Sequence, residues 1–172
     1  MKKLLVIVDY QVDFVNGSLG FGGADLLEKK IFNRILKAQN EGEDIVFTKD
    51  IHNENYLKSE EGKNLPVIHC QKGSAGAELF GSLKQFENQY PVFEKGAFAS
   101  IDLGNYIKDK DYDEITIVGL VSYICVLSNA VICKAALPNA HIIVEKDLTS
   151  AYDINAQKIG FEALKNIHVE IR

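Results

Sequence analysis

The chain has 172 residues, of which 47% are hydrophobic and 25% charged, and its formal net charge is −5 at pH 7. This balance is typical of one globular domain with a sizeable core, and we predict a single domain over residues 1–172. The acidic charge argues against a nucleic-acid partner, and the apolar start, interrupted by Asp9 and Asp13, is too short to cross a membrane and resembles no signal peptide.

Hydrophobic periodicity, together with glycine and proline breaks, divides the chain into alternating strands and helices. In chain order, we predict a strand at 3–8, a helix at 25–40, a strand at 44–48, a short helix at 76–86, a strand at 90–95, a helix at 102–110, a strand at 114–120, a helix at 125–137, a strand at 141–146, a helix at 153–166 and a strand at 167–171. This alternation predicts an α/β fold with a mostly parallel six-stranded sheet and helices on both faces. A long polar connection at 49–63 suggests a functional loop.

Polar residues follow four of the predicted strands, at the points where the strands end. Asp9 follows the first, Asp50 and His52 follow the second, Lys95 the third and Cys125 the fourth. In open α/β sheets, ligands bind outside the carboxyl ends of the strands. These five residues are therefore the first candidates for a functional site.

Cys125 lies in the stretch "VGLVSYICV" (residues 118–126), between a β-branched strand and an apolar helix. A helix start lowers the pKa of a thiol and favours the nucleophilic thiolate, although a buried structural cysteine is the alternative reading. Cys133 and Cys70 are interpreted as packing residues. Three cysteines without framework spacing indicate reduced thiols, and we predict a cytoplasmic protein.

Two charged candidates accompany Cys125. Asp9 is a candidate general base for the thiol proton, with a turn-forming side chain as the alternative. Lys95 is followed by a glycine, and its ammonium would favour both a nearby carboxylate and developing negative charge. A solvated surface lysine is the other interpretation.

The motif "TKDIH" places Asp50 and His52 two positions apart, so in an extended segment both side chains point to one face. His69 follows across the polar connection and completes a set of three metal-ligand types. Glu60 and Glu61 offer a further carboxylate ligand, or form a solvated acidic pair. Each signal is weak by itself, and their gathering around one loop favours a metal site.

As an ordered set, these motifs resemble the isochorismatase-like cysteine hydrolases, and within them the nicotinamidase/pyrazinamidase-like branch. The resemblance covers nearly the whole chain and is carried by "VDYQVDF" with Asp9, "TKDIH" with Asp50 and His52, "HCQKGSAGAEL" from His69, "FEKGAF" with Lys95, and "GLVSYICVLSNAV" with Cys125. It implies a Rossmann-like three-layer α/β sandwich.

The resemblance also implies a catalytic triad. In it Asp9 is the base, Lys95 its charged partner and Cys125 the nucleophile of an amidase that passes through a thioester and releases ammonia. A cis peptide bond is implied between Leu120 and Val121. The backbone N–H groups of Val121 and Cys125 would then form an oxyanion hole.

The resemblance further implies a divalent metal ion held by Asp50, His52 and His69, with Glu61 as an additional ligand. Zinc is the expected metal, with manganese or iron as alternatives. The implied substrate is nicotinamide or a similar small aromatic amide.

The chain departs from the family pattern in its aromatic residues. Nicotinamidases usually carry Trp in the D-x-H motif, where this chain has Ile51, and the chain contains no Trp. We therefore expect Phe14, Phe98 and Tyr123 to form the substrate pocket. The missing aromatics favour an alternative substrate, a carbamoyl or ureido compound or another small amide.

Two other classes of protein, a non-catalytic binding or scaffold protein and a redox protein, fit the sequence less well. A non-catalytic binding or scaffold protein on the same fold would not need Asp, Lys and Cys at three strand ends. A redox pair of Cys125 and Cys133 is excluded, because eight helical positions separate the two by about 12 Å. The resemblance also predicts a homo-oligomer, a dimer or tetramer.

Overall fold

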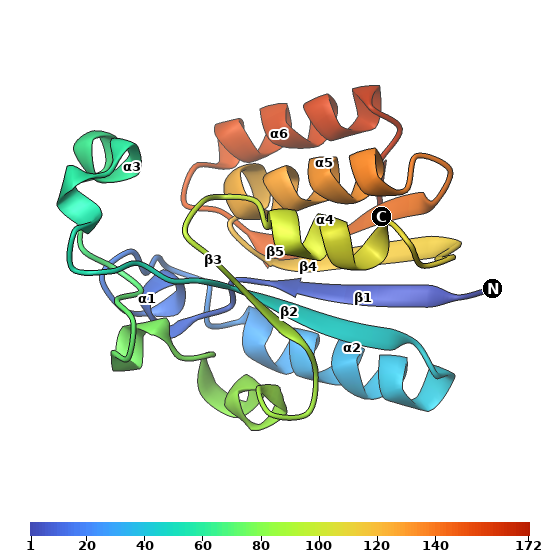
Figure 1. The fold of residues 1–172 in the computed structure, drawn as a ribbon, viewed down its shortest axis with the longest axis horizontal. Helices are drawn as coiled ribbons and strands as arrows, with labels where there is room; N and C mark the ends of the chain where they lie inside the picture. Colours follow the sequence, from blue (N-terminus) through green and yellow to red (C-terminus); the bar gives the residue numbers. More distant parts are fainter.

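The computed structural model describes residues 1–172 and contains a six-stranded sheet in the order β3-β2-β1-β4-β5-β6 (Figure 1). Every neighbouring pair of strands is parallel. The strands are β1 (Lys3–Val8), β2 (Asp44–Asp50), β3 (Val92–Lys95), β4 (Glu114–Leu120), β5 (His141–Ser150) and β6 (Glu170–Ile171). The predicted α/β sandwich is confirmed, and the sheet is parallel throughout.

Helices cover both faces of this sheet, and short helical turns lie at the carboxyl ends of the strands (Figure 1). The α-helices are α1 (Val12–Val15), α2 (Leu27–Glu41), α3 (Glu60–Asn64), α4 (Ile101–Ile107), α5 (Leu127–Ala136) and α6 (Ile154–Asn166). The 3-10 helices are η1 (Tyr56–Lys58), η2 (Ala75–Ala77) and η3 (Gly81–Phe86), and η4 (Ser122–Val126) is a π-helical turn. None of the helices combines the length and hydrophobicity that a bilayer crossing requires.

The sheet divides the hydrophobic core into two layers, and successive side chains of β1 point alternately into one layer and the other. Leu5 and Ile7 point into a cluster with α2, and Leu4, Val6 and Val8 point into a second cluster with α4, α5 and α6. All five side chains are completely buried. This explains why β1 is a continuous apolar run instead of an alternating pattern.

The strand order reverses between β1 and β4, because the chain builds β2 and β3 on one side of β1 and β4 to β6 on the other. Such a switch point opens a crevice at the carboxyl ends of the two strands. Gly119 pairs with Val8 there at a φ of 114°, and a Cβ on Gly119 would lie 2.0 Å from the Val8 carbonyl oxygen. Only glycine therefore allows β1 and β4 to approach closely beside this crevice.

Three expectations for the elements are wrong in detail. The segment predicted as one helix at 76–86 forms two short 3-10 helices instead, and the second begins at Gly81 with a φ of 56°. The polar connection carries η1 and α3 of its own, and β2 extends to Asp50. Strand β5 continues to Ser150 through an irregularity in its pairing with β4, which periodicity does not reveal.

Candidate active site

Asp9 lies directly after β1 and its side chain is completely buried. Its backbone has a φ of 45°, a left-handed conformation that Asp tolerates better than most residues. The Thr48 hydroxyl donates a hydrogen bond of 2.6 Å to Oδ1, and the Lys95 ammonium lies 2.6 Å from Oδ2. Burial raises the pKa of Asp9, and the charge of Lys95 opposes that rise.

Cys125 lies in η4, which follows β4, and 6% of its surface is exposed. The Lys95 ammonium is 3.8 Å from its sulfur. Burial raises the pKa of the Cys125 thiol well above its usual range, the Asp9 charge raises it further, and Lys95 lowers it. This differs from the expectation that a helix start would lower the pKa, because the fold buries the sulfur and places a carboxylate beside it.

The peptide bond between Leu120 and Val121 is cis, as the family resemblance implied for these two residues. It joins the end of β4 to η4. The Val121 carbonyl accepts hydrogen bonds from the N–H groups of Ile124 and Val126, which builds the turn that holds Cys125.

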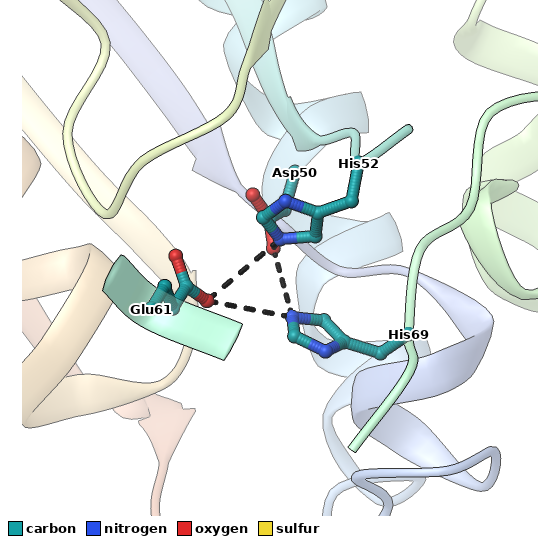
Figure 2. A group of neighbouring side chains, drawn as sticks. All are labelled: Asp50, His52, Glu61 and His69. Carbon is teal, nitrogen blue, oxygen red and sulfur yellow. Dashed lines mark hydrogen bonds and ion pairs between the residues drawn. The ribbon is translucent and has the colours of Figure 1, made fainter. Parts of the chain in front are cut away.

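A second cluster contains Asp50, His52, Glu61 and His69, whose side chains converge on one point (Figure 2). One ligand atom from each of the four lies within 4.8 Å of all the others. The Asp50 carboxylate is 2.8 Å from Nε2 of His52 and 3.3 Å from Nε2 of His69. Glu61 approaches the same two nitrogens to 3.7 and 3.6 Å.

Backbone contacts orient this cluster. Nδ1 of His69 donates to the Val67 carbonyl at 2.7 Å, which directs Nε2 toward the other ligand atoms. Gln11 is completely buried and bonds both backbone groups of Asp50, at 2.8 Å each. Asp50 is thereby fixed at the end of β2.

The donor set fits a divalent cation. Oδ2 of Asp50 faces both imidazole nitrogens, whereas Oδ1 is buried without a hydrogen bond and lies 3.8 Å from the Lys95 ammonium. A cation beside Oδ2 would neutralise the carboxylates that converge there. Burial alone would raise the pKa of Asp50, but His52, His69 and Lys95 lower it to about 2, so the carboxylate is ionised. Two imidazole nitrogens and two carboxylates suit zinc, and manganese or iron can also accept such ligands.

A cavity of about 410 Å³ connects the Cys125 region with the metal-ligand cluster. Its lining includes Cys125 and Val121 at one side and Asp50, Glu61 and His69 at the other. A second cavity, of about 850 Å³, is lined by His52, Glu61 and Phe98 among others.

The aromatic lining of the 410 Å³ cavity differs in part from the prediction. Phe14 and Phe98 line it, as expected, and Phe21 and Tyr152 line it as well. Tyr123 is not among the residues that line this cavity, so its place in the substrate pocket stays a prediction. Its Cβ faces Gly160 of α6, and its ring packs against Tyr152 with centroids 5.7 Å apart. Tyr123 therefore contacts Tyr152 and supports the position of its ring.

Sequence reasoning missed several residues that hold the site. Thr48 and Gln11 are polar residues at positions with buried neighbours, a signal that was present in the sequence but has many structural explanations. Tyr152 follows a strand end that the periodicity placed several residues too early. It could not be assigned to the cavity without the full length of β5.

Comparisons with known proteins found a matching family model, curated relatives and solved structures of similar fold. A family model described as the Isochorismatase domain matches residues 3–172. The chain is 30% identical over 165 residues to the uncharacterized isochorismatase family protein PncA of Bacillus subtilis, covering 89% of this chain and 88% of the relative. It is 26% identical over 188 residues to the nicotinamidase/pyrazinamidase of Mycobacterium tuberculosis, covering 98% and 97%. The crystal structure of the Pyrococcus horikoshii pyrazinamidase in complex with zinc superposes with a TM-score of 0.87 at 22% identity, covering 100% and 99% of the two chains.

Proposed function

The chain belongs to the isochorismatase family, and from this premise we propose that it is a cysteine-dependent amidohydrolase acting on nicotinamide or a similar small aromatic amide. The products are the carboxylic acid and ammonia. One observation carries the proposal. The Lys95 ammonium lies 2.6 Å from the Asp9 carboxylate and 3.8 Å from the Cys125 sulfur, beside a cavity wide enough for a small ring.

The proposed reaction is an acyl transfer in two halves. Asp9 accepts the thiol proton of Cys125, and the sulfur attacks the amide carbon. Asp9 then returns the proton to the leaving nitrogen, so ammonia departs and a thioester remains. In the second half, water gives a proton to Asp9 and adds to the thioester, and the same proton restores the thiol as the acid leaves.

Two groups would stabilise the charges of this reaction. Lys95 keeps Asp9 ionised despite its burial and stays beside the forming thiolate. The backbone N–H groups of Val121 and Cys125 are the proposed oxyanion donors, each worth about 3–4 kcal/mol in the transition state.

Asp50, His52, Glu61 and His69 would hold a divalent cation, for which zinc is the first candidate and manganese or iron the alternatives. When bound, such a cation supplies a Lewis-acidic position that can take up a ring nitrogen of the substrate. The zinc complex of the Pyrococcus horikoshii pyrazinamidase supports this assignment through the shared fold.

The aromatic lining supports a ring-shaped substrate. Phe14, Phe21, Phe98 and Tyr152 come from different parts of the chain and surround the same cavity as Cys125. They supply the flat apolar surfaces that aromatic substrates require, in a chain without tryptophan.

An ammonia-release assay on nicotinamide, run with measurement of bound metal, tests the proposal. We expect ammonia from the wild type and none above background from Cys125→Ala, whereas Cys133→Ala, which alters the buried thiol of α5, keeps its activity. Ammonia from carbamoyl or ureido compounds but not from nicotinamide would establish the alternative substrate class. Full activity of Cys125→Ala would rule out the cysteine mechanism.

The proposal also covers the cellular compartment and the oligomeric state of the enzyme. All three cysteines are free and buried, which suits a reducing compartment such as the cytoplasm. We propose a homo-oligomer, a dimer or tetramer, whose mass light scattering would measure.

A further inference from the structure

Asn129 is a polar residue that the proposed reaction does not use, yet it is completely buried. It lies on α5, four positions after Cys125, and therefore on the same helical face one turn further on. Burial of an amide is costly unless its donors and acceptor find partners. The partners of Asn129 show what it holds together.

The Asn129 side chain connects two separate parts of the chain. Nδ2 donates to the Cys125 carbonyl at 2.8 Å and to the Phe98 carbonyl at 3.2 Å. Oδ1 accepts the Ser100 N–H at 3.0 Å. Both amide hydrogens and the amide oxygen are thus occupied. One bond stays within the nucleophile's own helix, and two reach the segment between β3 and α4.

That segment, residues 96–100, has no helix or strand of its own. Its other tie to the site is the hydrogen bond of 2.9 Å from the Lys95 ammonium to the Ala97 carbonyl. Phe98 is 46% exposed and lines both the 410 Å³ and the 850 Å³ cavities. Because nearly half of Phe98 is exposed, little packing restrains it, and hydrogen bonds to its backbone must hold it in place.

We propose that Asn129 is a positioning residue that fixes the Phe98 wall relative to Cys125 and so sets the width of the cavity at the nucleophile. The substrate class that this width admits is a flat aromatic amide. Without the two bonds to the segment, Phe98 swings outward and the cavity accepts bulkier groups. The inference rests on the proposed function, in which Cys125 is the nucleophile and Phe98 faces the substrate ring.

The test uses two cysteine reagents of different size on the full chain, iodoacetamide and N-phenylmaleimide, with peptide mass spectrometry reporting modification of Cys125. The variant Asn129→Thr keeps the bond to the Cys125 carbonyl, because a helical Thr hydroxyl reaches the carbonyl four residues earlier. It loses both bonds to the segment. Asn129→Asp keeps an acceptor for Ser100 but turns a carboxylate oxygen toward the other two carbonyls. Phe98→Ala shows the rates for an open wall.

Both Asn129 variants should raise the Cys125 rate with N-phenylmaleimide roughly tenfold relative to the rate with iodoacetamide, as expected for the loss of about one net hydrogen bond. Tyr112→Phe is the matched control, because it removes a hydrogen bond of 2.8 Å to Asp44 at the opposite end of the sheet. It should lower the midpoint of thermal unfolding and leave the ratio of the two rates unchanged.

An unchanged ratio in both Asn129 variants, with unfolding midpoints lowered as in Tyr112→Phe, would reduce Asn129 to a structural residue and overturn the inference. A second arm measures KM and kcat on nicotinamide, where Asn129→Thr should raise KM more than it lowers kcat. The alkylation arm needs no substrate. A failure of the proposed function would therefore show as inactive wild type with the size effect intact, whereas a failure of this inference would show as active wild type without it.

Discussion

The ammonium group of Lys95 lies 2.6 Å from Oδ2 of Asp9, and the two side chains are 3% and 0% exposed. Such a buried pair forms only where both charges find partners, since each ion alone would be costly to bury. Asp9 has Thr48 as a second partner, and Lys95 has the Ala97 carbonyl. Lys95 thereby opposes the rise in the Asp9 pKa that burial causes.

Replacing Lys95 by Met should therefore affect both stability and activity. The unpaired Asp9 carboxylate would cost about 3–5 kcal/mol of unfolding free energy, and burial would leave it protonated and unable to accept the Cys125 proton. We expect kcat to fall by roughly 100-fold or more. Urea unfolding and an ammonia-release assay measure the two effects. Lys84→Met, which removes an exposed ion pair with Glu78, is the control and should cost less than about 1 kcal/mol. Equal effects of the two substitutions would contradict the assignment.

The metal site predicts different behaviour for two adjacent glutamates. Glu61 points to His52 and His69, whereas Glu60 is 85% exposed in its side chain and pairs with Lys63. Glu61→Gln should lower the affinity for zinc by roughly 10- to 100-fold, and Glu60→Gln should leave it unchanged. Zinc titration of the chelator-treated protein gives both affinities. Equal zinc affinity in the two variants would remove Glu61 from the ligand set.

The buried thiol of Cys133 predicts a loss of stability in alkaline solution. Burial raises the pKa of Cys133 to about 12, above the value of about 8.5 in an unfolded chain. Between these values the unfolded state has released a proton that the folded state retains. Unfolding free energy should then fall as pH rises, by about 1.4 kcal/mol per pH unit for this one group.

Urea unfolding of the wild type and of Cys133→Ala, from pH 6 to pH 11, isolates this contribution. The wild type should lose stability more steeply above pH 9, and the two curves should run parallel below pH 8. Parallel curves over the whole range would show that Cys133 is not the group responsible.

The aromatic lining predicts different roles for two neighbouring tyrosines. Tyr152 lines the cavity, and Tyr123 packs behind it. Tyr152→Ala should raise KM for nicotinamide roughly 3- to 10-fold, as expected for the loss of one aromatic contact. Tyr123→Phe keeps the supporting ring and should leave KM within about twofold. An increase in KM for Tyr123→Phe as large as that for Tyr152→Ala would contradict the different roles assigned to the two tyrosines.

Much of the fold could be predicted because the buried parallel strands are continuous apolar runs. The predicted strands 3–8 and 114–120 coincide with β1 and β4, and α2 ends before Gly42, whose φ is 70°. The helix prediction for residues 76–86 was wrong, because the glycines and small apolar residues of this segment are compatible with one helix and with two 3-10 helices. The spacing of apolar residues within the segment does not show which of the two conformations packs against the rest of the fold.

The sequence alone determined which chemical groups stand at the ends of the strands, because parallel strands present their carboxyl ends at one edge of the sheet. The sequence could therefore predict one site that contains Asp9, Asp50, Lys95 and Cys125. Only the tertiary structure decided the direction of the Cys125 pKa shift and the choice of Tyr152 over Tyr123 for the cavity wall. Those outcomes depend on burial and on residues distant in the chain, such as Gly160 beside Tyr123 and Asp9 beside Cys125. Through-space contacts of this kind leave no period or spacing in a single sequence.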